Sequence, residues 1–175
     1  MKYDIVPLSM MIEEWAAEDV TEYLCSFICD RDKELELFLR NRAVEFERRD
    51  LARTFLLVHD ERIIGYFSLA STVLEIKDEW PVSNTLKKKM NAVEGPTTAF
   101  LIGQVCKAKG VEEKIGPQII DKAMGMFRKA REICGGRVVC VDCKRELLGF
   151  YEENGFRVIS ESSESGLFRL VLLCQ

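Results

Sequence analysis

The chain has 175 residues and a formal net charge of −4. This length predicts one domain, residues 1–175, with a substantial apolar core. The acidic balance argues against a dedicated nucleic-acid binder, which would carry a basic surplus, but it does not exclude a local basic patch. The first twenty residues contain no long apolar run, so we expect neither a signal peptide nor a membrane span and place the chain in the cytoplasm.

The amino-terminal part of the chain is predicted to form one strand, two helices and a hairpin. A short strand is expected at residues 2–8. Apolar positions recur at helical spacing through residues 9–29 and again through residues 33–50, which predicts two helices. Residues 53–58 and 62–70 are β-rich and flank the turn sequence His-Asp-Glu, so they are predicted to pair as a hairpin.

The carboxy-terminal part alternates between helices and apolar strands. Its predicted elements are a short helix that exposes three consecutive lysines, a strand buried on both faces, a long helix, a second buried strand, a short helix and two final strands: 82–92, 99–106, 117–134, 137–142, 145–155, 156–160 and 167–174. The main order, β-α-α-β-β-β-α-β-α-β-β, predicts an α/β fold with a mixed, strongly twisted sheet of about seven strands and about four helices.

The seven cysteines favour buried thiols over a metal site. Cys25 and Cys29 have a spacing that could suit zinc, and so do Cys140 and Cys143. The second pair lies in a strand, however, where positions three apart point to opposite faces. Core packing is therefore preferred, and no metal is predicted. The only histidine, His59, lies at the predicted hairpin turn, so we assign it no role.

A strand, a short loop and a helix follow one another over residues 99–120, which is the arrangement of an anion site. The first N–H groups of a helix have no intrahelical acceptor, and the helix dipole favours negative charge there. The sequence contains neither GxxxxGK[ST] nor GxGxxG, so it lacks the usual signatures of nucleotide hydrolysis and dinucleotide binding.

Several strings in this order resemble the GNAT superfamily of acyl-coenzyme A-dependent N-acetyltransferases. RTFLLVHDERIIGYFSLA is similar to its second and third strands, AFLIGQVC to its fourth strand, and RVVCVDCKRELLGFYEENGF to its fifth strand, fourth helix and sixth strand. The resemblance covers nearly the whole chain. It implies acetyl-CoA as cosubstrate and direct transfer of the acetyl group to a primary amine.

The resemblance also implies which residues bind coenzyme A. The family carries Gln or Arg, two residues, Gly, one residue, then Gly or Ala before its third helix, and here these three positions hold Val111, Lys114 and Gly116. Only the last one matches. Since glycine would allow a left-handed backbone and close approach, we expect weaker pyrophosphate binding, through Glu113, Lys114, Ile115 and Gly116. The lysine ammonium could instead pair with a phosphate as a point charge.

By the same resemblance, the pantetheine arm contacts the backbone of Val105, Cys106 and Lys107. Cys106 is interpreted as a packing residue. Tyr151 is the predicted catalytic residue, which would donate its proton to the departing coenzyme A thiolate. The alternative is that Tyr151 only packs against its aromatic neighbours.

No general base is assigned. A glutamate on the fourth strand often serves as base in the family, but AFLIGQVC holds no acidic residue. The nearest acidic candidates in the sequence are Glu75, Asp78 and Glu79, and either a water-mediated base or capture of a neutral amine would also account for the reaction.

Three functions stay open, and they differ in the acceptor. The first is an acetyltransferase for an unknown small-molecule or peptide amine. The second is a toxin that acetylates aminoacyl-tRNA, which the segment FLRNRAVEFERRDLARTFLLV resembles; tRNA is not favoured because the chain is acidic. The third is a non-catalytic acyl-CoA binder or interaction module. Homodimers are frequent in the family, and no membrane partner is expected.

Overall fold

The structure is a computed structural model that describes residues 2–90 and 95–174. The described residues form one mixed sheet of seven strands in the order β1-β2-β3-β4-β5-β7-β6. β4 and β5 are parallel, whereas β1 and β2, β2 and β3, β5 and β7, and β6 and β7 are antiparallel. The predicted α/β fold is therefore confirmed. The strands are β1 Asp4–Pro7, β2 Arg53–His59, β3 Arg62–Leu74, β4 Thr97–Lys107, β5 Val138–Cys143, β6 Arg157–Glu161 and β7 Phe168–Leu173.

The described residues contain more helices than the sequence predicted, because each of the first two predicted helices is broken. The helices are α1 Leu8–Glu14, α2 Ala17–Cys25, α3 Lys33–Asn41, α4 Ala43–Arg48, α5 Asn84–Met90, α6 Gly116–Cys134 and α7 Leu148–Glu153, and a 3₁₀ turn precedes α7 at Arg145–Leu147. Two extended residues, Trp15 and Ala16, separate α1 from α2.

The break between α3 and α4 is smaller and explains why periodicity missed it. Arg42 leaves the helical region at φ −125° and ψ −26°. Its N–H still donates to the Phe38 carbonyl at 2.9 Å, and its carbonyl still accepts from the Phe46 N–H at 3.0 Å. The apolar face therefore continues across the break, and the spacing of apolar residues carries no sign of it.

The chain separates into two compact units, each made of two segments. Unit 1 contains Met1–Ala70 and Gly103–Ile119, and unit 2 contains Ser71–Ile102 and Ile120–Gln175. β3, β4 and α6 each run from one unit into the other. The expectation of a single domain stays a prediction.

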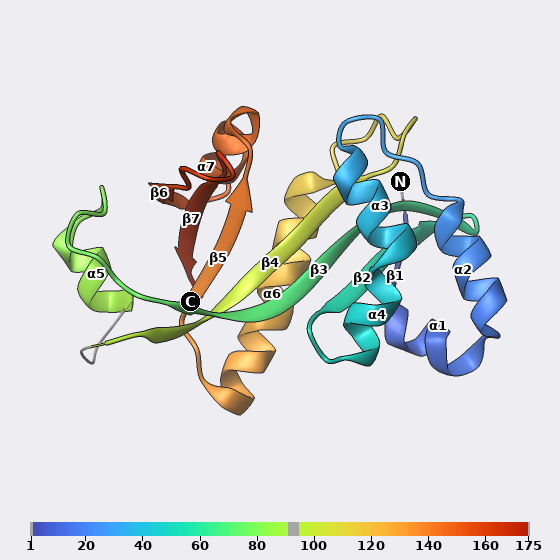
Figure 1. The fold of residues 1–175 in the computed structure, drawn as a ribbon, viewed down its shortest axis with the longest axis horizontal. Helices are drawn as coiled ribbons and strands as arrows, with labels where there is room; N and C mark the ends of the chain where they lie inside the picture. Colours follow the sequence, from blue (N-terminus) through green and yellow to red (C-terminus); the bar gives the residue numbers. More distant parts are fainter. Residues whose placement is uncertain (1, 91–94, 175) are drawn as a thin grey trace. The chain divides into compact units, whose positions relative to one another are not determined.

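Unit 1 places helices α1–α4 against β1, β2 and the first part of β3 (Figure 1). Its core includes Leu24, Leu39, Leu56 and Tyr66, all of them buried. β2 and β3 form the predicted hairpin, since His59 pairs with Arg62 across the two intervening residues. Those two residues have positive φ values of 46° and 61°, which is the backbone of the two-residue turns that match the twist of paired strands.

Unit 2 is built around β5, whose side chains are almost all buried, as predicted for a strand covered on both faces. β5 pairs with β4 over four residues and with β7 over its whole length (Figure 1). On one face its core includes Trp80, Cys140 and Val171. α6 packs through Phe127, whose ring stacks on Phe100 with centroids 4.7 Å apart.

The predicted short helix at 82–92 is found as α5, and Asn91 and Ala92 lie outside the described residues. Of its three lysines, Lys88 and Lys89 are exposed. None of the helices in the described parts of the chain has the length and apolarity that a bilayer crossing requires.

Candidate functional site

The carboxy-terminal part of β4, in unit 1, carries the residues predicted to contact pantetheine. The register between β4 and β5 covers Ala99–Ile102 and does not reach Val105, Cys106 or Lys107. On its other side this part of β4 lies very close to β3. A Cβ placed on Gly65 would be 2.8 Å from the Cys106 carbonyl oxygen, so only glycine allows this approach.

Cys106 has the surroundings of a packing residue. Its side chain is buried in the core of unit 1. Burial, together with a hydrogen bond that the protonated thiol makes with Cys29, raises the pKa of its thiol far above the usual range. A thiol that stays protonated is a poor nucleophile. The geometry therefore agrees with the interpretation that this cysteine takes no covalent part in acyl transfer.

The loop before α6 does not need the glycine that Lys114 replaces. Among the described non-glycine residues, positive φ occurs only at Asp50, Asp60 and Glu61, so Lys114 adopts an ordinary backbone and its side chain is exposed. The left-handed turn lies earlier, at Gly110, with φ of +79°. The weaker pyrophosphate binding expected from the lost glycine stays a prediction.

Several backbone amides of this loop are free to donate. Ile115 is the exception, because its N–H already donates to the Glu113 carbonyl at 3.0 Å and its side chain is buried. The N–H groups of Glu113, Lys114 and Gly116 donate to no other described residue. The first bond of α6 runs from Ile119 N–H to the Ile115 carbonyl at 3.0 Å. Unpaired donors thus gather at the positive end of a 19-residue helix.

Tyr151 lies on α7 in unit 2 and is 4% exposed. Its ring makes edge contacts with Phe150 and Phe156, with centroids 5.0 and 5.6 Å apart. Its hydroxyl makes no hydrogen bond to a described residue, yet the only fully buried side-chain polar atom without a partner in the described chain is Thr54 Oγ1. The Tyr151 oxygen therefore keeps some solvent contact.

The hydroxyl of Tyr151 stays protonated at physiological pH. Burial raises the pKa of this phenol, and the nearby Cys143 raises it further. The group is therefore neutral across the physiological pH range and carries a proton that no neighbour shares. Packing against aromatic rings and donation of a proton are both compatible with this environment.

A cavity of about 490 Å³ lies in unit 2 beside two of the acidic residues considered as bases. Glu75 and Glu79 line it, and Asp78 does not. Among the described residues of unit 2, no hydrogen bond or charge effect links any of the three to Tyr151. The base therefore stays unassigned. The lining residues are Val73, Leu74, Glu75, Lys77, Glu79, Trp80, Ile159, Ser160 and Arg169.

Four polar residues that the sequence did not single out are buried. Glu36, Glu47, Thr54 and Ser68 are each at most 6% exposed. The two glutamates lie on α3 and α4, within the segment that the apolar spacing predicts as one helix. Glu36 is four residues before Arg40 and three after Lys33, which is the spacing of helical ion pairs, but such spacing does not indicate burial.

Comparison of the sequence with known protein families and with curated proteins gives no match. Comparison of the structure does. AtaT complexed with acetyl-methionyl-tRNAfMet superposes with a TM-score of 0.77 at 19% identity, over 98% of this chain and 95% of that one. A tyrosine-to-phenylalanine mutant of KacT gives 0.76 at 18% identity, over 99% and 96%.

The chain has the fold of AtaT and KacT. This confirms the GNAT-like fold expected from the sequence. A third similar structure is a tyrosine-to-phenylalanine mutant of the AtaT toxin bound to the C-terminus of the antitoxin AtaR and to acetyl-CoA, with a TM-score of 0.72 at 18% identity, over 99% of this chain and 94% of that one.

Proposed function

We propose that this protein transfers the acetyl group of acetyl-CoA to the α-amino group of an aminoacyl-tRNA. The observation that carries the proposal is the likeness, over nearly the whole chain, to AtaT complexed with acetyl-methionyl-tRNAfMet. On the sequence alone, a small-molecule or peptide amine is the first expectation. The comparisons favour the tRNA alternative, and we reverse that order.

Acetyl-CoA would be held by backbone groups of unit 1. The free N–H groups of Glu113, Lys114 and Gly116 fit a pyrophosphate, which needs several donors at short range. The exposed Lys114 ammonium adds a point charge beside them. The backbone of Val105–Lys107 would bind the pantetheine arm. Acetyl-CoA supplies the acetyl group as a reactive thioester.

Tyr151 would act as the general acid. Its hydroxyl proton passes to the departing thiolate, which leaves more easily once it is protonated, and the proton that the attacking amine loses restores the phenol. Because its pKa is raised, the phenol carries this proton when acetyl-CoA binds. Structures of both AtaT and KacT contain a tyrosine-to-phenylalanine mutation, which is a reason to test a tyrosine in this fold.

The absence of an assigned base suits this acceptor better than a lysine-like amine. An α-amino group has an ordinary pKa near 8, whereas an alkylammonium titrates above 10. A substantial fraction of the former is neutral at physiological pH and can attack without a base. An amino acid ester is therefore a better nucleophile at physiological pH than a side-chain amine that has to be deprotonated first.

The distribution of charge between the two units is compatible with RNA binding. Unit 1 contains 12 Lys and Arg against 17 Asp and Glu, whereas unit 2 contains 13 against 12. The acidic surplus of the chain therefore belongs to unit 1. The exposed Lys88 and Lys89 of unit 2 are available to phosphate groups.

The proposal is tested by incubating the purified protein with acetyl-CoA and a panel of acceptors. The panel contains charged tRNAs, the same tRNAs uncharged, free amino acids and small amines. Release of free thiol with charged tRNA, together with an acetylated amino acid recovered after ester hydrolysis, is the expected result. Equal or faster release with small amines would restore the original ranking.

Cofactor binding is measured separately, by thermal unfolding with and without acetyl-CoA. A ligand at a hundred times its Kd stabilises the folded state by about 2.7 kcal/mol. A clear shift without thiol release from any acceptor would point to the non-catalytic binder. A protein that neither shifts nor turns over would leave only the interaction module.

A further inference from the structure

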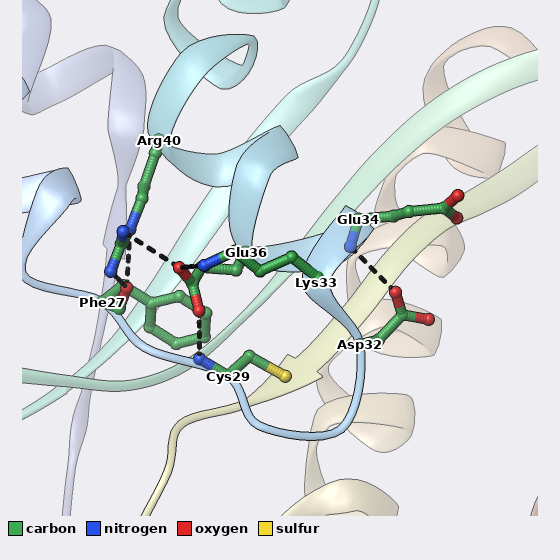
Figure 2. Close-up of polar contacts among 7 residues, drawn as sticks. All are labelled: Phe27, Cys29, Asp32, Lys33, Glu34, Glu36 and Arg40. Atoms are coloured by element: carbon green, nitrogen blue, oxygen red, sulfur yellow. Dashed lines mark hydrogen bonds and ion pairs between the residues drawn. The ribbon is translucent and has the colours of Figure 1, made fainter.

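The loop between α2 and α3 is held by side chains of α3, as Figure 2 shows. The Cys29 N–H donates to Glu36 Oε2 at 2.9 Å. Arg40 Nε donates to the Phe27 carbonyl at 2.8 Å, and Arg40 Nη1 lies 2.9 Å from Glu36 Oε1. Lys33 Nζ pairs with the same carboxylate oxygen. These contacts, called the Glu36 clamp below, attach the middle of the loop to the helix.

Glu36 is the centre of the clamp and is ionised. Its side chain is buried, while those of Lys33 and Arg40 reach solvent. The hydrogen bond from Lys33 and the one from the Cys29 N–H hold the pKa of the carboxyl below its usual range, against the effect of burial. A buried carboxylate is tolerated only when its oxygens are paired in this way. Changing it alters every contact of the clamp except the one between Arg40 and the Phe27 carbonyl.

The same loop contacts the segment that follows β4, within unit 1. The Lys109 N–H donates to the Ile28 carbonyl at 2.8 Å. Lys109 Nζ lies 3.2 Å from Asp30 Oδ2. Ile28 and Asp30 flank Cys29, the residue that the clamp holds. Cys29 itself packs in the same core as Cys106 of β4. The loop therefore connects α3 to Lys109.

Lys109 is the residue at which the proposed pyrophosphate loop begins. Gly110 follows it with φ of +79°, which turns the chain. The Val111 N–H closes this turn on the Ala108 carbonyl at 3.4 Å, and Lys107 Nζ donates to the Glu113 carbonyl at 3.3 Å. Anchoring Lys109 therefore fixes the start of the segment that carries the free amides.

We propose that Glu36 is a positioning residue for acetyl-CoA binding. It acts through the loop between α2 and α3, which anchors Lys109 and so sets the placement of the amides at Glu113, Lys114 and Gly116. The cofactor part of this inference rests on the proposed function. The mechanical link from Glu36 to Lys109 does not, and it is tested on its own.

The link is tested by amide hydrogen exchange in Glu36→Gln without any ligand. This substitution keeps the shape of the side chain but removes its charge. It also replaces one of the oxygens that faces the donors of the clamp by an NH₂ group, which cannot accept a hydrogen bond from them. We expect the Lys109 amide to exchange about tenfold faster, since its partner carbonyl lies on the released loop. The control is Glu45→Gln, which breaks an exposed i,i+4 pair with Arg49 and has no contact with this loop. Unchanged exchange at Lys109 in Glu36→Gln would overturn the link.

The consequence for the cofactor is tested with acetyl-CoA titrations. Glu36→Gln should raise the Kd for acetyl-CoA about tenfold, a coupling of ordinary size, and leave kcat at saturating acetyl-CoA within about twofold. Lys33→Ala, which removes only the exposed partner, should fold normally and shift Kd in the same direction by less. Faster exchange with an unchanged Kd would overturn the positioning role.

These outcomes separate the two proposals. A wild-type protein that does not respond to acetyl-CoA counts against the proposed function and against the cofactor part of this inference, whereas the exchange of Lys109 still decides the link. If wild type and Glu36→Gln bind acetyl-CoA with the same Kd, this inference is overturned and the proposed function is not. A loss of kcat with unchanged Kd would show that Glu36 acts on the chemistry instead.

Discussion

At the scale of single residues, two buried tyrosines differ in what their hydroxyl groups do. Tyr66 donates to the Leu35 carbonyl at 2.6 Å, whereas the Tyr151 hydroxyl makes no hydrogen bond to a described residue. A group that has no structural partner can be removed without structural cost. The unpaired hydroxyl is therefore the one to test for a chemical role.

We expect Tyr151→Phe to lower kcat by about a hundredfold, the lower end for loss of a general acid, and to leave the melting temperature within about 2 °C of wild type. Tyr66→Phe is the matched control. It should lose about 1 kcal/mol of stability, because a buried hydrogen bond is removed, and keep its turnover. Steady-state kinetics and thermal unfolding of both variants decide the matter. Turnover of Tyr151→Phe equal to wild type would remove this residue from the mechanism.

The buried carboxylate of Glu36 makes stability depend on pH. Its pKa is lowered from the usual 4.5, so the folded state binds its proton more weakly than the unfolded chain does. Its stabilising effect is therefore complete above pH 4.5 and is lost as the pH falls below that value. Urea unfolding of wild type and Glu36→Gln should differ by about 2 kcal/mol at about pH 7, and the difference should shrink as the pH falls below 4.5. A difference that grows on acidification would show that the proton binds in the opposite sense.

At the scale of elements, the close approach of β3 to β4 depends on one glycine. A Cβ at Gly65 would lie 2.8 Å from the Cys106 carbonyl oxygen and 3.1 Å from Ile115 Cδ1. Gly65→Ala should therefore cost about 2 kcal/mol, as overpacking does, and weaken acetyl-CoA binding by moving Ile115. Gly125→Ala on α6 is the control: the nearest atom is 3.8 Å away, and the change should stabilise by about 0.5 kcal/mol. Unfolding curves of both variants give the comparison.

The loop before α6 offers a test of how the pyrophosphate would be held. Because Lys114 has an ordinary backbone, Lys114→Gly gains nothing in conformation and loses a charge. We expect it to bind acetyl-CoA several-fold more weakly than wild type at low salt and equally at high salt, where the charge is screened. Calorimetric titration at two salt concentrations measures this. Tighter binding by Lys114→Gly would mean that the family glycine is needed after all.

Sequence reasoning was accurate for elements defined by local chemistry and less so where tertiary contacts decide. The hairpin at His59 and the buried strand β5 followed from β-branched runs and a turn signal. The breaks at Trp15 and Arg42 did not, because the apolar spacing runs through both. The burial of Glu36 also escaped, since a charged residue in a mixed-charge helix has no local mark that distinguishes a core position from a solvated one.

At the scale of the whole molecule, the fold was predictable, whereas the acceptor that we propose was not the one that the sequence favoured. The order of elements and a few strings were enough to indicate the fold, because those features reflect the core. Net charge pointed away from tRNA, because it averages over two units of different composition. A partner that meets only part of a surface responds to local charge.

The proposed tRNA acceptor predicts that turnover depends on salt. Lys88 and Lys89 are exposed. Replacing both by alanine should raise KM for aminoacyl-tRNA, and it should reduce the dependence of this KM on salt by the amount expected for the loss of up to about two phosphate contacts. KM for acetyl-CoA should not change. Measuring both constants between about 50 and 200 mM salt, a range over which phosphate contacts weaken strongly, is the test. An unaltered salt slope would place the RNA elsewhere on the protein.

β7 follows β6 along the chain but lies between β6 and β5 in the sheet, paired with both. A nascent chain that has not yet emerged as far as Phe168 therefore leaves β5 with an open edge and β6 without any neighbour. Such edges invite pairing with other chains. Until β7 has emerged, a chain under synthesis is therefore prone to self-association, and a chaperone would be most useful at that moment.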